Sequence, residues 1–265
     1  MSESTHQCGG CGGCGGHHHG EPSEPQKLAV NALSQVKKVI GIAGGKGGVG
    51  KSLVTGLLAA GLAAGGQEVA ILDADIANPA IPRMFELPQS VTRGEAGLYP
   101  AITDSGIKVM SIGLLTEDET DTVTTRGLVM AGIVEQFWAT VVWDQVDCLL
   151  IDLPSGLGDV TEFAFERLQL DGIILVTTAQ ELANQAARRT IRLALEHQVP
   201  ILGLVENFSN SFDGNAAEAV SRAFQLPILD RLPLDFDFST AADTGRVEAF
   251  TPYPLAKTIE VLITI

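Results

Sequence analysis

The chain of 265 residues has few basic residues and no long hydrophobic run. Its 17 lysines and arginines stand against 32 acidic residues, which gives a formal net charge of −15. This balance disfavours binding to nucleic acid or to an anionic membrane through bulk electrostatics. No apolar run is long enough to span a bilayer, and the first 35 residues lack the apolar stretch of a secretory signal. The sequence therefore predicts a cytosolic protein with no nucleic-acid or membrane partner.

Cysteine is scarce beyond the first residues of the chain. Three of the four cysteines fall within the first 14 residues, at the spacing Cys-x-x-Cys-x-x-Cys, and a histidine follows at the same interval. In a reducing compartment such a run predicts metal or redox ligands before disulfides. The candidate ligands are Cys8, Cys11, Cys14 and His17, which suit either an iron–sulfur cluster or zinc. The alternatives are an unstructured tail that scavenges metal, or residues derived from expression.

Composition divides the chain into a tail and one domain. Residues 1–33 are rich in glycine, histidine, proline and serine, so they predict a disordered tail, and residues 34–265 predict a single globular domain. In the domain, apolar strand-like runs alternate with helical stretches, which predicts an α/β fold: a mainly parallel sheet with helices on both faces. The expected strands are 39–43, 68–72, 107–111, 148–151, 172–176, 201–205 and 228–229.

A glycine-rich segment joins the first expected strand to an apolar helix expected over 53–64. It reads Gly44-Gly45-Lys46-Gly47-Gly48-Val49-Gly50-Lys51-Ser52. Glycines let such a loop adopt positive φ angles and turn several N–H groups toward phosphate oxygens. In this strand–loop–helix context the segment predicts a P-loop that binds ATP through residues 45–52. Lys51 would reach the β and γ phosphates, and the Ser52 hydroxyl would coordinate Mg²⁺.

Acidic residues end two further expected strands at the same edge of the sheet. Asp73 and Asp75 follow the strand at 68–72, and Asp152 follows the strand at 148–151, before a glycine-containing loop. One of the first two carboxylates would orient the attacking water, with a helix cap as the alternative role. Asp152 would hold Mg²⁺, as in a Walker B strand. Cys148, at the start of that strand, is expected to be a small core hydrophobe.

These motifs together resemble the Mrp/ApbC branch of the MinD/ParA ATPases. The resemblance covers about residues 38–250, and it rests on the loop with Lys46 and Lys51 and on five further segments: 73–84, 109–113, 125–127, 152–154 and 205–209. It implies an ATP-bound homodimer in which Lys46 reaches the partner's nucleotide. It also implies that Asp75 is a switch residue for hydrolysis, that Asn207 contacts the adenine, and that residues 231–235 close over the base.

The chain departs from this family at the cargo site. Members of the branch carry an iron–sulfur cluster between subunits on a Cys-x-x-Cys pair shortly after the segment that matches Glu206-Asn207, and transfer it to apo-proteins. Here residues 207–214 read Asn-Phe-Ser-Asn-Ser-Phe-Asp-Gly and contain no cysteine. The resemblance therefore supports the ATP switch more firmly than the cargo, and only the tail cysteines offer substitute thiolates.

The resulting prediction is a slow, Mg²⁺-dependent, dimeric ATPase that couples its nucleotide state to a metal cluster or to an apo-protein client. A positioning switch of the MinD/ParA type and a regulatory subunit without cluster transfer are the alternatives. Three arginines, at 188, 189 and 192, lie on a helix expected to start near Glu181, and a solvated helix face is favoured for them over DNA binding. The apolar segment 255–265 is expected to be a closing helix, since it lacks the basic face of a membrane-associating helix.

Overall fold

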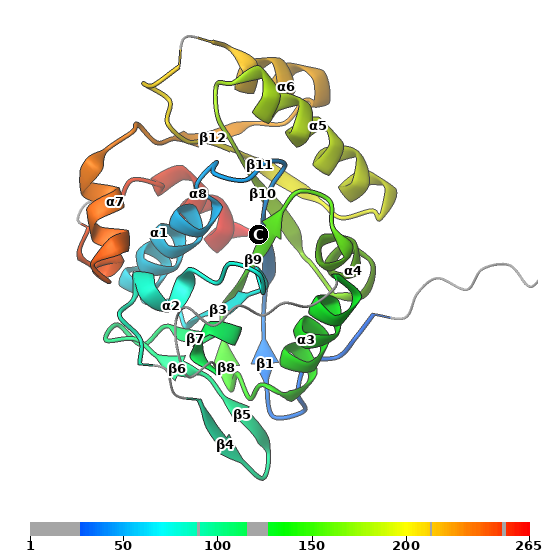
Figure 1. Cartoon of the computed structure of the whole chain (residues 1–265), viewed down its shortest axis with the longest axis vertical. Coiled ribbons are helices and arrows are strands. Elements are labelled where there is room, and N and C mark those ends of the chain that lie inside the picture. The colour runs from blue at the N-terminus through cyan, green and yellow to red at the C-terminus, as the bar shows by residue number, and fades with distance from the viewer. Residues whose placement is uncertain (1–26, 89–90, 116–126, 213, 251–252) are drawn as a thin grey trace, which may run out of the picture.

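The structure is a computed structural model. Its central element is an eight-stranded sheet in the order β12-β11-β10-β2-β9-β3-β7-β6 (Figure 1). The structure describes residues 27–88, 91–115, 127–212, 214–250 and 253–265. Neighbouring strands are parallel except β6 and β7. The predicted mainly parallel sheet is therefore confirmed. Its strands are β2 (Val39–Gly44), β3 (Val69–Asp73), β6 (Ala101–Ile102), β7 (Lys108–Met110), β9 (Cys148–Ser155), β10 (Gly172–Thr177), β11 (Ile201–Glu206) and β12 (Ile228–Arg231).

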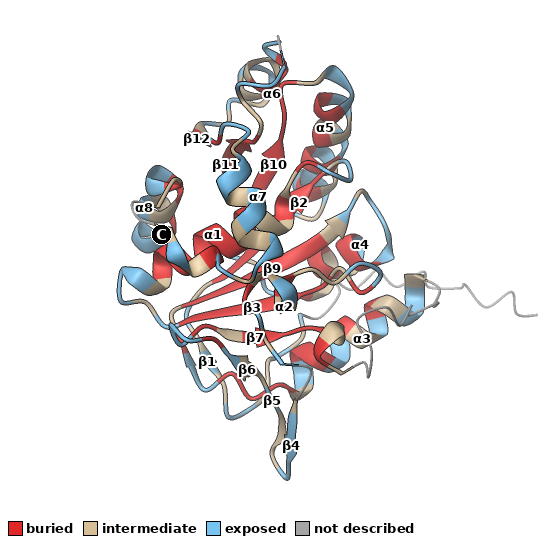
Figure 2. Cartoon of the chain, turned by 60° about the vertical axis from the view of Figure 1, so that its left-hand side comes forward, coloured by how far each residue is buried: buried red, intermediate tan, exposed pale blue. Residues whose placement is uncertain are grey.

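Helices cover both faces of the sheet because its central strands are apolar on both sides. In β2, Ile40 and Ile42 belong to the core under α1, whereas Val39 and Ala43 belong to the core on the opposite face. Figure 2 shows these strands as a continuous buried layer between the helices. The first face carries α1 (Lys51–Ala64), α2 (Ile81–Met84), α7 (Phe236–Asp243) and α8 (Ala256–Thr264), and the second carries α3 (Gly127–Thr140), α4 (Asp159–Arg167), α5 (Glu181–Glu196) and α6 (Ala216–Phe224).

The closing helix α8 agrees with the expectation for the carboxyl terminus. Its Leu262 is fully buried in the core beneath α1. Among the described residues, no helix is both long enough and apolar enough to cross a membrane. Two 3₁₀ turns, η1 (Ile112–Leu114) and η2 (Val247–Ala249), complete the helical elements of these residues.

Four short strands lie outside the main sheet and were not predicted. β4 (Thr92–Gly94) and β5 (Gly97–Tyr99) form an antiparallel hairpin at one end of the molecule (Figure 1). β1 (Gln35–Val36) pairs in parallel with β8 (Gln145–Val146). Runs of two or three residues are too short to show a strand periodicity, so the sequence pattern gave no signal for them.

The amino-terminal segment 27–37 packs along the domain as a strap, which corrects the expected boundary between residues 33 and 34. Lys27 Nζ donates to the carbonyl oxygens of Phe165 and Leu168 at the end of α4. Trp138 Nε1 of α3 donates to the Leu28 carbonyl oxygen over 3.0 Å. Residues 27–33 therefore belong to the domain. The candidate ligands Cys8, Cys11, Cys14 and His17 lie outside the described residues, as do 116–126 with Thr125 and Arg126.

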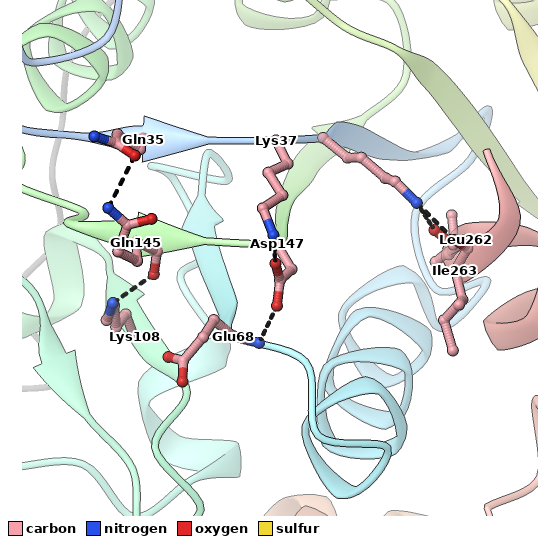
Figure 3. Close-up of polar contacts among 9 residues, drawn as sticks. Gln35, Lys37, Glu68, Lys108, Gln145, Asp147, Leu262 and Ile263 are labelled. Atoms are coloured by element: carbon pink, nitrogen blue, oxygen red, sulfur yellow. Dashed lines mark hydrogen bonds and ion pairs between the residues drawn. The ribbon is translucent and has the colours of Figure 1, made fainter.

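The amino-terminal edge of the sheet is held by polar contacts (Figure 3). Asp147, just before β9, accepts a hydrogen bond from Lys37 Nζ over 2.6 Å and another from the Glu68 backbone N–H over 2.9 Å. These two contacts, the lysine first, hold the pKa of Asp147 below its ordinary value. Lys38 and Lys108 instead donate to backbone carbonyls, at Leu262, Ile263, Trp143 and Gln145. Three of the scarce lysines are thus used to tie strands and helix ends together.

The strap should stabilise the domain through Asn31, whose side chain contacts three backbone groups. Its Nδ2 donates toward Ala96 O and Thr140 O, and its Oδ1 accepts from the Leu33 N–H. Asn31→Ala is expected to lower the free energy of unfolding by about 1–2 kcal/mol, because it leaves these partly buried groups without partners. Urea denaturation measures the change. Gln136→Ala, on the exposed face of α3, serves as the control, and equal midpoints for the two variants would show that the Asn31 contacts contribute nothing.

Candidate nucleotide-binding site

The predicted P-loop connects the end of β2 to the start of α1 at the carboxyl edge of the sheet. Gly48 and Gly50 have φ angles of 79° and 85°, a region that side chains with a Cβ rarely adopt. Helix α1 begins at Lys51, two residues earlier than expected. The positive end of the α1 dipole and its free N–H groups therefore face the loop, where an anion is favoured.

Two of the loop glycines are required by neighbouring elements. A Cβ on Gly45 would lie 2.2 Å from the carbonyl carbon of Ala186 in α5, and a Cβ on Gly50 would lie 2.2 Å from Asn207 Nδ2. Gly47 has only the Ser155 side chain nearby, and Gly48 has open space. The loop is thus held at its two ends, by α5 and by Asn207, and its middle faces outward.

The two lysines of the loop lie in different environments. Lys51 is 7% exposed, and its aliphatic stem packs so closely on Gly44 that a Cβ there would lie 2.7 Å from Lys51 Cδ. Lys46 is exposed and borders a cleft of about 500 Å³ with the start of α5 and the residues before α6. The geometry therefore gives Lys51 a position inside the site and leaves Lys46 at its rim.

A carboxylate of β9 is hydrogen-bonded to hydroxyl groups near the start of α1. Asp152 is fully buried and accepts a 2.6 Å hydrogen bond from Ser52 Oγ, and its other oxygen lies 2.9 Å from Thr55 Oγ1. The structure therefore brings together Ser52 and Asp152, the two residues expected to hold Mg²⁺. Thr55 was missed from the sequence, although it follows Ser52 at the i, i+3 spacing that places two residues on one helix face.

The two acids after β3 differ in depth. Asp73 is fully buried, pairs in register with Asp152, and accepts hydrogen bonds from Ser111 Oγ and from the Asp75 N–H. Burial, followed by the charge of Asp152, raises the pKa of Asp73 well above its ordinary value. Asp75 is only partly buried, and burial raises its pKa against the opposing effect of Lys51. Asp75 is therefore the carboxylate of this pair that solvent can reach, while Asp73 is structural.

Desolvation also dominates the electrostatics of Asp152. Its burial raises the pKa of the carboxyl group, although Lys51 and the hydroxyl contacts act in the opposite direction. Among the described residues, Lys51 is the cation that acts on Asp75 and Asp152. A bound cation would stabilise the ionised form of these carboxylates.

Asn207 closes the other side of the loop. It follows β11, is 1% exposed, and its Nδ2 donates a 2.9 Å hydrogen bond to the Val49 carbonyl oxygen. Its Oδ1 accepts from the N–H of Phe208, which has a φ of 56°, an uncommon backbone conformation for a bulky residue. Phe208 Cζ lies 3.9 Å from the position of a Cβ on Gly50. The sharp turn after Asn207 therefore brings both side chains against the P-loop.

The loop after β9 connects the site to α3 and α4. Gly156 has a φ of 84°, and α4 begins at Asp159. A Cβ on Gly127, the first residue of α3, would lie 2.0 Å from Asp159 Oδ2. A carboxylate at this helix start is favoured by the helix dipole. Asp159, at the end of this loop, thus packs so closely on the start of α3 that position 127 has no room for a side chain.

Thiolate ligands are missing from the described part of the site. Cys148 is buried at the start of β9, and burial raises its pKa to about 12, so it is the inert core residue that was expected. No group of three or more histidine, cysteine or acidic residues among the described residues is arranged to hold a metal ion by itself. A metal centre made from the tail residues stays a prediction.

The buried Asp73 predicts a pH dependence of stability. In the unfolded chain an aspartate ionises near about pH 4, whereas the folded protein resists ionising Asp73 until a higher pH. Stability is therefore lost as the pH rises from about 4 through the folded pKa. Asp73→Asn in EDTA should be more resistant to urea than the wild type at about pH 8, and the difference should shrink toward about pH 4. Asp104→Asn, at an exposed loop position, is the control, and a pH-independent difference for Asp73→Asn would contradict this interpretation.

Known proteins are similar to this chain in sequence over most of its length. The family model described as "ParA: NUBPL iron-transfer P-loop NTPase" matches residues 35–264. The iron–sulfur cluster carrier protein of Methanocaldococcus jannaschii is 38% identical over 213 residues, which cover 76% of this chain and 73% of the relative. A cytosolic Fe-S cluster assembly factor, the NUBP2 homolog of Trichoplax adhaerens, is 36% identical over 237 residues, covering 82% and 89%.

Comparison with solved structures agrees with these sequence matches. A nucleotide-binding protein of Archaeoglobus fulgidus in complex with ADP is 35% identical, with a TM-score of 0.70 over 82% of this chain and 90% of that one. The cell division ATPase MinD of Pyrococcus furiosus, 19% identical with a TM-score of 0.66 over 86% and 97%, shares the fold. With a family model matched over nearly the whole described domain and relatives of this identity, the chain belongs to the NUBPL iron-transfer family of ParA-type P-loop NTPases.

Proposed function

We propose that this protein is a slow, Mg²⁺-dependent ATPase that works as a homodimer and couples its nucleotide state to carrying an iron–sulfur cluster or binding an assembly client. The observation that supports it best is the hydrogen bond between Ser52 and Asp152 directly below the P-loop. The ADP complex of the Archaeoglobus relative and the carrier names of the other relatives point the same way. The name of the Trichoplax relative agrees with the expected cytosolic location.

The oxygens of Ser52 and Asp152 fit a magnesium ion. A hydroxyl and a carboxylate already in contact are hard oxygen ligands, and Mg²⁺ commonly takes one or two protein ligands together with phosphate oxygens. The absence of a larger ligand cluster among the described residues agrees with that mode. Bound there, the ion would neutralise charge on the β and γ phosphates.

The protein side chains would act mainly by charge and position. Lys51, buried against β2, would neutralise phosphate charge, while the loop N–H groups would bind the phosphate oxygens. Asp75, accessible and close enough to Lys51 to interact with it, would orient the attacking water. The described site holds no histidine, so no side chain there is a strong base at neutral pH. Turnover should therefore be slow.

Lys46 would act across a dimer interface. Its ammonium group is exposed at the rim of the site, beside a cleft that also exposes Leu182 and Phe212. A cation at that position can reach a phosphate of a second subunit, as an arginine finger does. The partners that we propose are therefore a second copy of this chain and an apo-protein or assembly client, with no nucleic acid and no membrane.

Whether the protein carries a cluster decides between the proposed function and a second one. Residues 207–214 contain no cysteine, so a cluster would depend on Cys8, Cys11, Cys14 and His17. Apparent zinc binding to comparable short peptides, about 10–16 kcal/mol, is of the same size as the cost of ordering the residues from 8 to 17, about 1–2 kcal/mol each. If these residues bind no cluster, the missing cysteine pair favours a regulatory ATPase of the same family that has no cluster transfer.

The two loop lysines should have separable functions. Lys51→Ala should abolish ATP binding in calorimetry, because a buried phosphate ligand is lost. Lys46→Ala should bind Mg·ATP nearly as well as the wild type but fail to dimerise with a non-hydrolysable analogue in sedimentation velocity. Lys257→Ala, an exposed lysine of α8, should behave as the wild type in both. Unchanged sedimentation of Lys46→Ala with the analogue would rule out the role in trans.

The cargo can be tested by anaerobic reconstitution with iron and sulfide. The full chain should acquire the visible absorption of an iron–sulfur cluster, whereas residues 27–265 alone and the Cys8/Cys11/Cys14→Ser variant should not. Retention of the strap keeps the truncated domain intact. A cluster that persists without residues 1–26 would disprove the tail site, and no iron uptake by any form would favour the regulatory function.

A further inference from the structure

The order of the strands shows on which side of the P-loop a nucleoside would lie. Asp152 in β9 and Asp75 after β3 lie on one side of β2, whereas Asn207 after β11 lies on the other. The acids mark the metal and the terminal phosphate. Because ligands of open α/β sheets bind beyond the carboxyl ends of the strands, the nucleoside of the proposed ATP would extend toward β11 and β12.

Two segments form that side of the site. The base-side loop comprises residues 207–212, after β11. The closing segment comprises residues 231–235 and begins at the last residue of β12. The Leu232 N–H donates to the Glu206 carbonyl oxygen over 2.8 Å, and the Ser209 N–H donates to the Leu232 carbonyl oxygen over 2.9 Å. Arg231 adds a 2.6 Å ion pair to the buried Glu206 and a further one to Glu218 of α6. The two segments are therefore joined firmly where the strands end.

Beyond that point a single side chain continues the connection. Asn210 Oδ1 accepts the Leu234 N–H over 2.6 Å, and Asn210 Nδ2 lies 3.4 Å from the Leu234 carbonyl oxygen. The carboxamide thus contacts both backbone groups of one residue, as a paired strand would. The Ser211 hydroxyl also donates a hydrogen bond to Asn210 Oδ1, over 3.2 Å.

Among the described residues, no other hydrogen bond or ion pair joins the outer halves of the two segments. Leu234 is 42% exposed and Asn210 is exposed, so hydrophobic burial contributes little there. Without the Asn210 contacts, the closing segment would be hydrogen-bonded to the base-side loop at Leu232 but not beyond Leu232. The base-side loop also carries Asn207, whose hydrogen bond to Val49 reaches the P-loop. A looser base-side loop would therefore disturb the phosphate end of the site as well.

We propose that Asn210 is a positioning residue that fixes the closing segment against the base-side loop and so preforms the wall on which the nucleoside of ATP binds. The proposal rests on the proposed nucleotide function. Asn210 does not touch the nucleotide; it acts through the backbone of Leu234. Its contribution is to remove the ordering cost that binding would otherwise carry, which is the general effect of preorganisation on affinity.

The test compares Asn210→Ala, Asn210→Asp and the control Gln136→Ala with the wild type, all as the full chain. Amide hydrogen exchange of the free protein should speed up in residues 231–235 for Asn210→Ala, and calorimetry should show Mg·ATP affinity weakened about tenfold, the loss expected for about two modest hydrogen bonds. Asn210→Asp keeps the acceptor for Leu234 N–H and loses the donor, so an intermediate loss is expected. Gln136→Ala removes an exposed carboxamide of α3, outside both segments, and should match the wild type.

The outcomes separate this proposal from the function on which it rests. If the wild type has no affinity for Mg·ATP, the proposed function fails. If the wild type binds and Asn210→Ala binds equally well, the positioning role is wrong while the function stands. Faster exchange throughout the sheet strands of Asn210→Ala, together with weaker binding, would indicate general destabilisation and would also overturn the proposal, since the expected change is confined to the two segments.

Discussion

The buried carboxylate of Asp152 is the contact on which the rest of the site depends. It lies in the central strand β9 and accepts hydrogen bonds from Ser52 and Thr55 near the start of α1. Desolvating a carboxylate is costly, and the charge of Lys51, followed by the hydroxyl contacts, offsets only part of the resulting rise in the pKa of Asp152. Because β9 lies between β2 and β3, this contact places the P-loop, the acids after β3 and the start of α1 in one rigid arrangement.

Around this contact, the proposed function would be divided between the two sides of β2. The acidic side, with Asp73, Asp75 and Asp152, has raised carboxyl pKa values and suits a cation. The other side, with Asn207 and the closing segment, offers amide and backbone groups that would suit a nucleoside, and its Arg231 is paired with Glu206 and Glu218. Lys46 stands apart from both at the rim. A molecule with this division can bind one end of a nucleotide by charge and the other by shape, while leaving one cation for a second molecule.

Much of this could be predicted from the sequence, for identifiable physical reasons. The strands at 39–43 and 172–176 are continuous apolar runs, and buried parallel strands require such runs. The P-loop was recognisable because glycine spacing and strand–loop–helix context coincide. The strap at 27–37 was missed because its stability comes from tertiary contacts, such as that of Trp138 with Leu28, and not from its own composition. Thr55 and Asn210 were missed for the same reason: each acts through a residue distant in sequence.

A structure with Mn²⁺ and a non-hydrolysable ATP analogue tests the central claim most directly, because the anomalous signal of manganese locates the ion independently of the protein. The account predicts manganese beside Ser52 Oγ and Asp152, phosphates within residues 45–52, and the nucleoside on the Asn207 side of β2. Manganese elsewhere, or a nucleotide that leaves the loop empty, would contradict it.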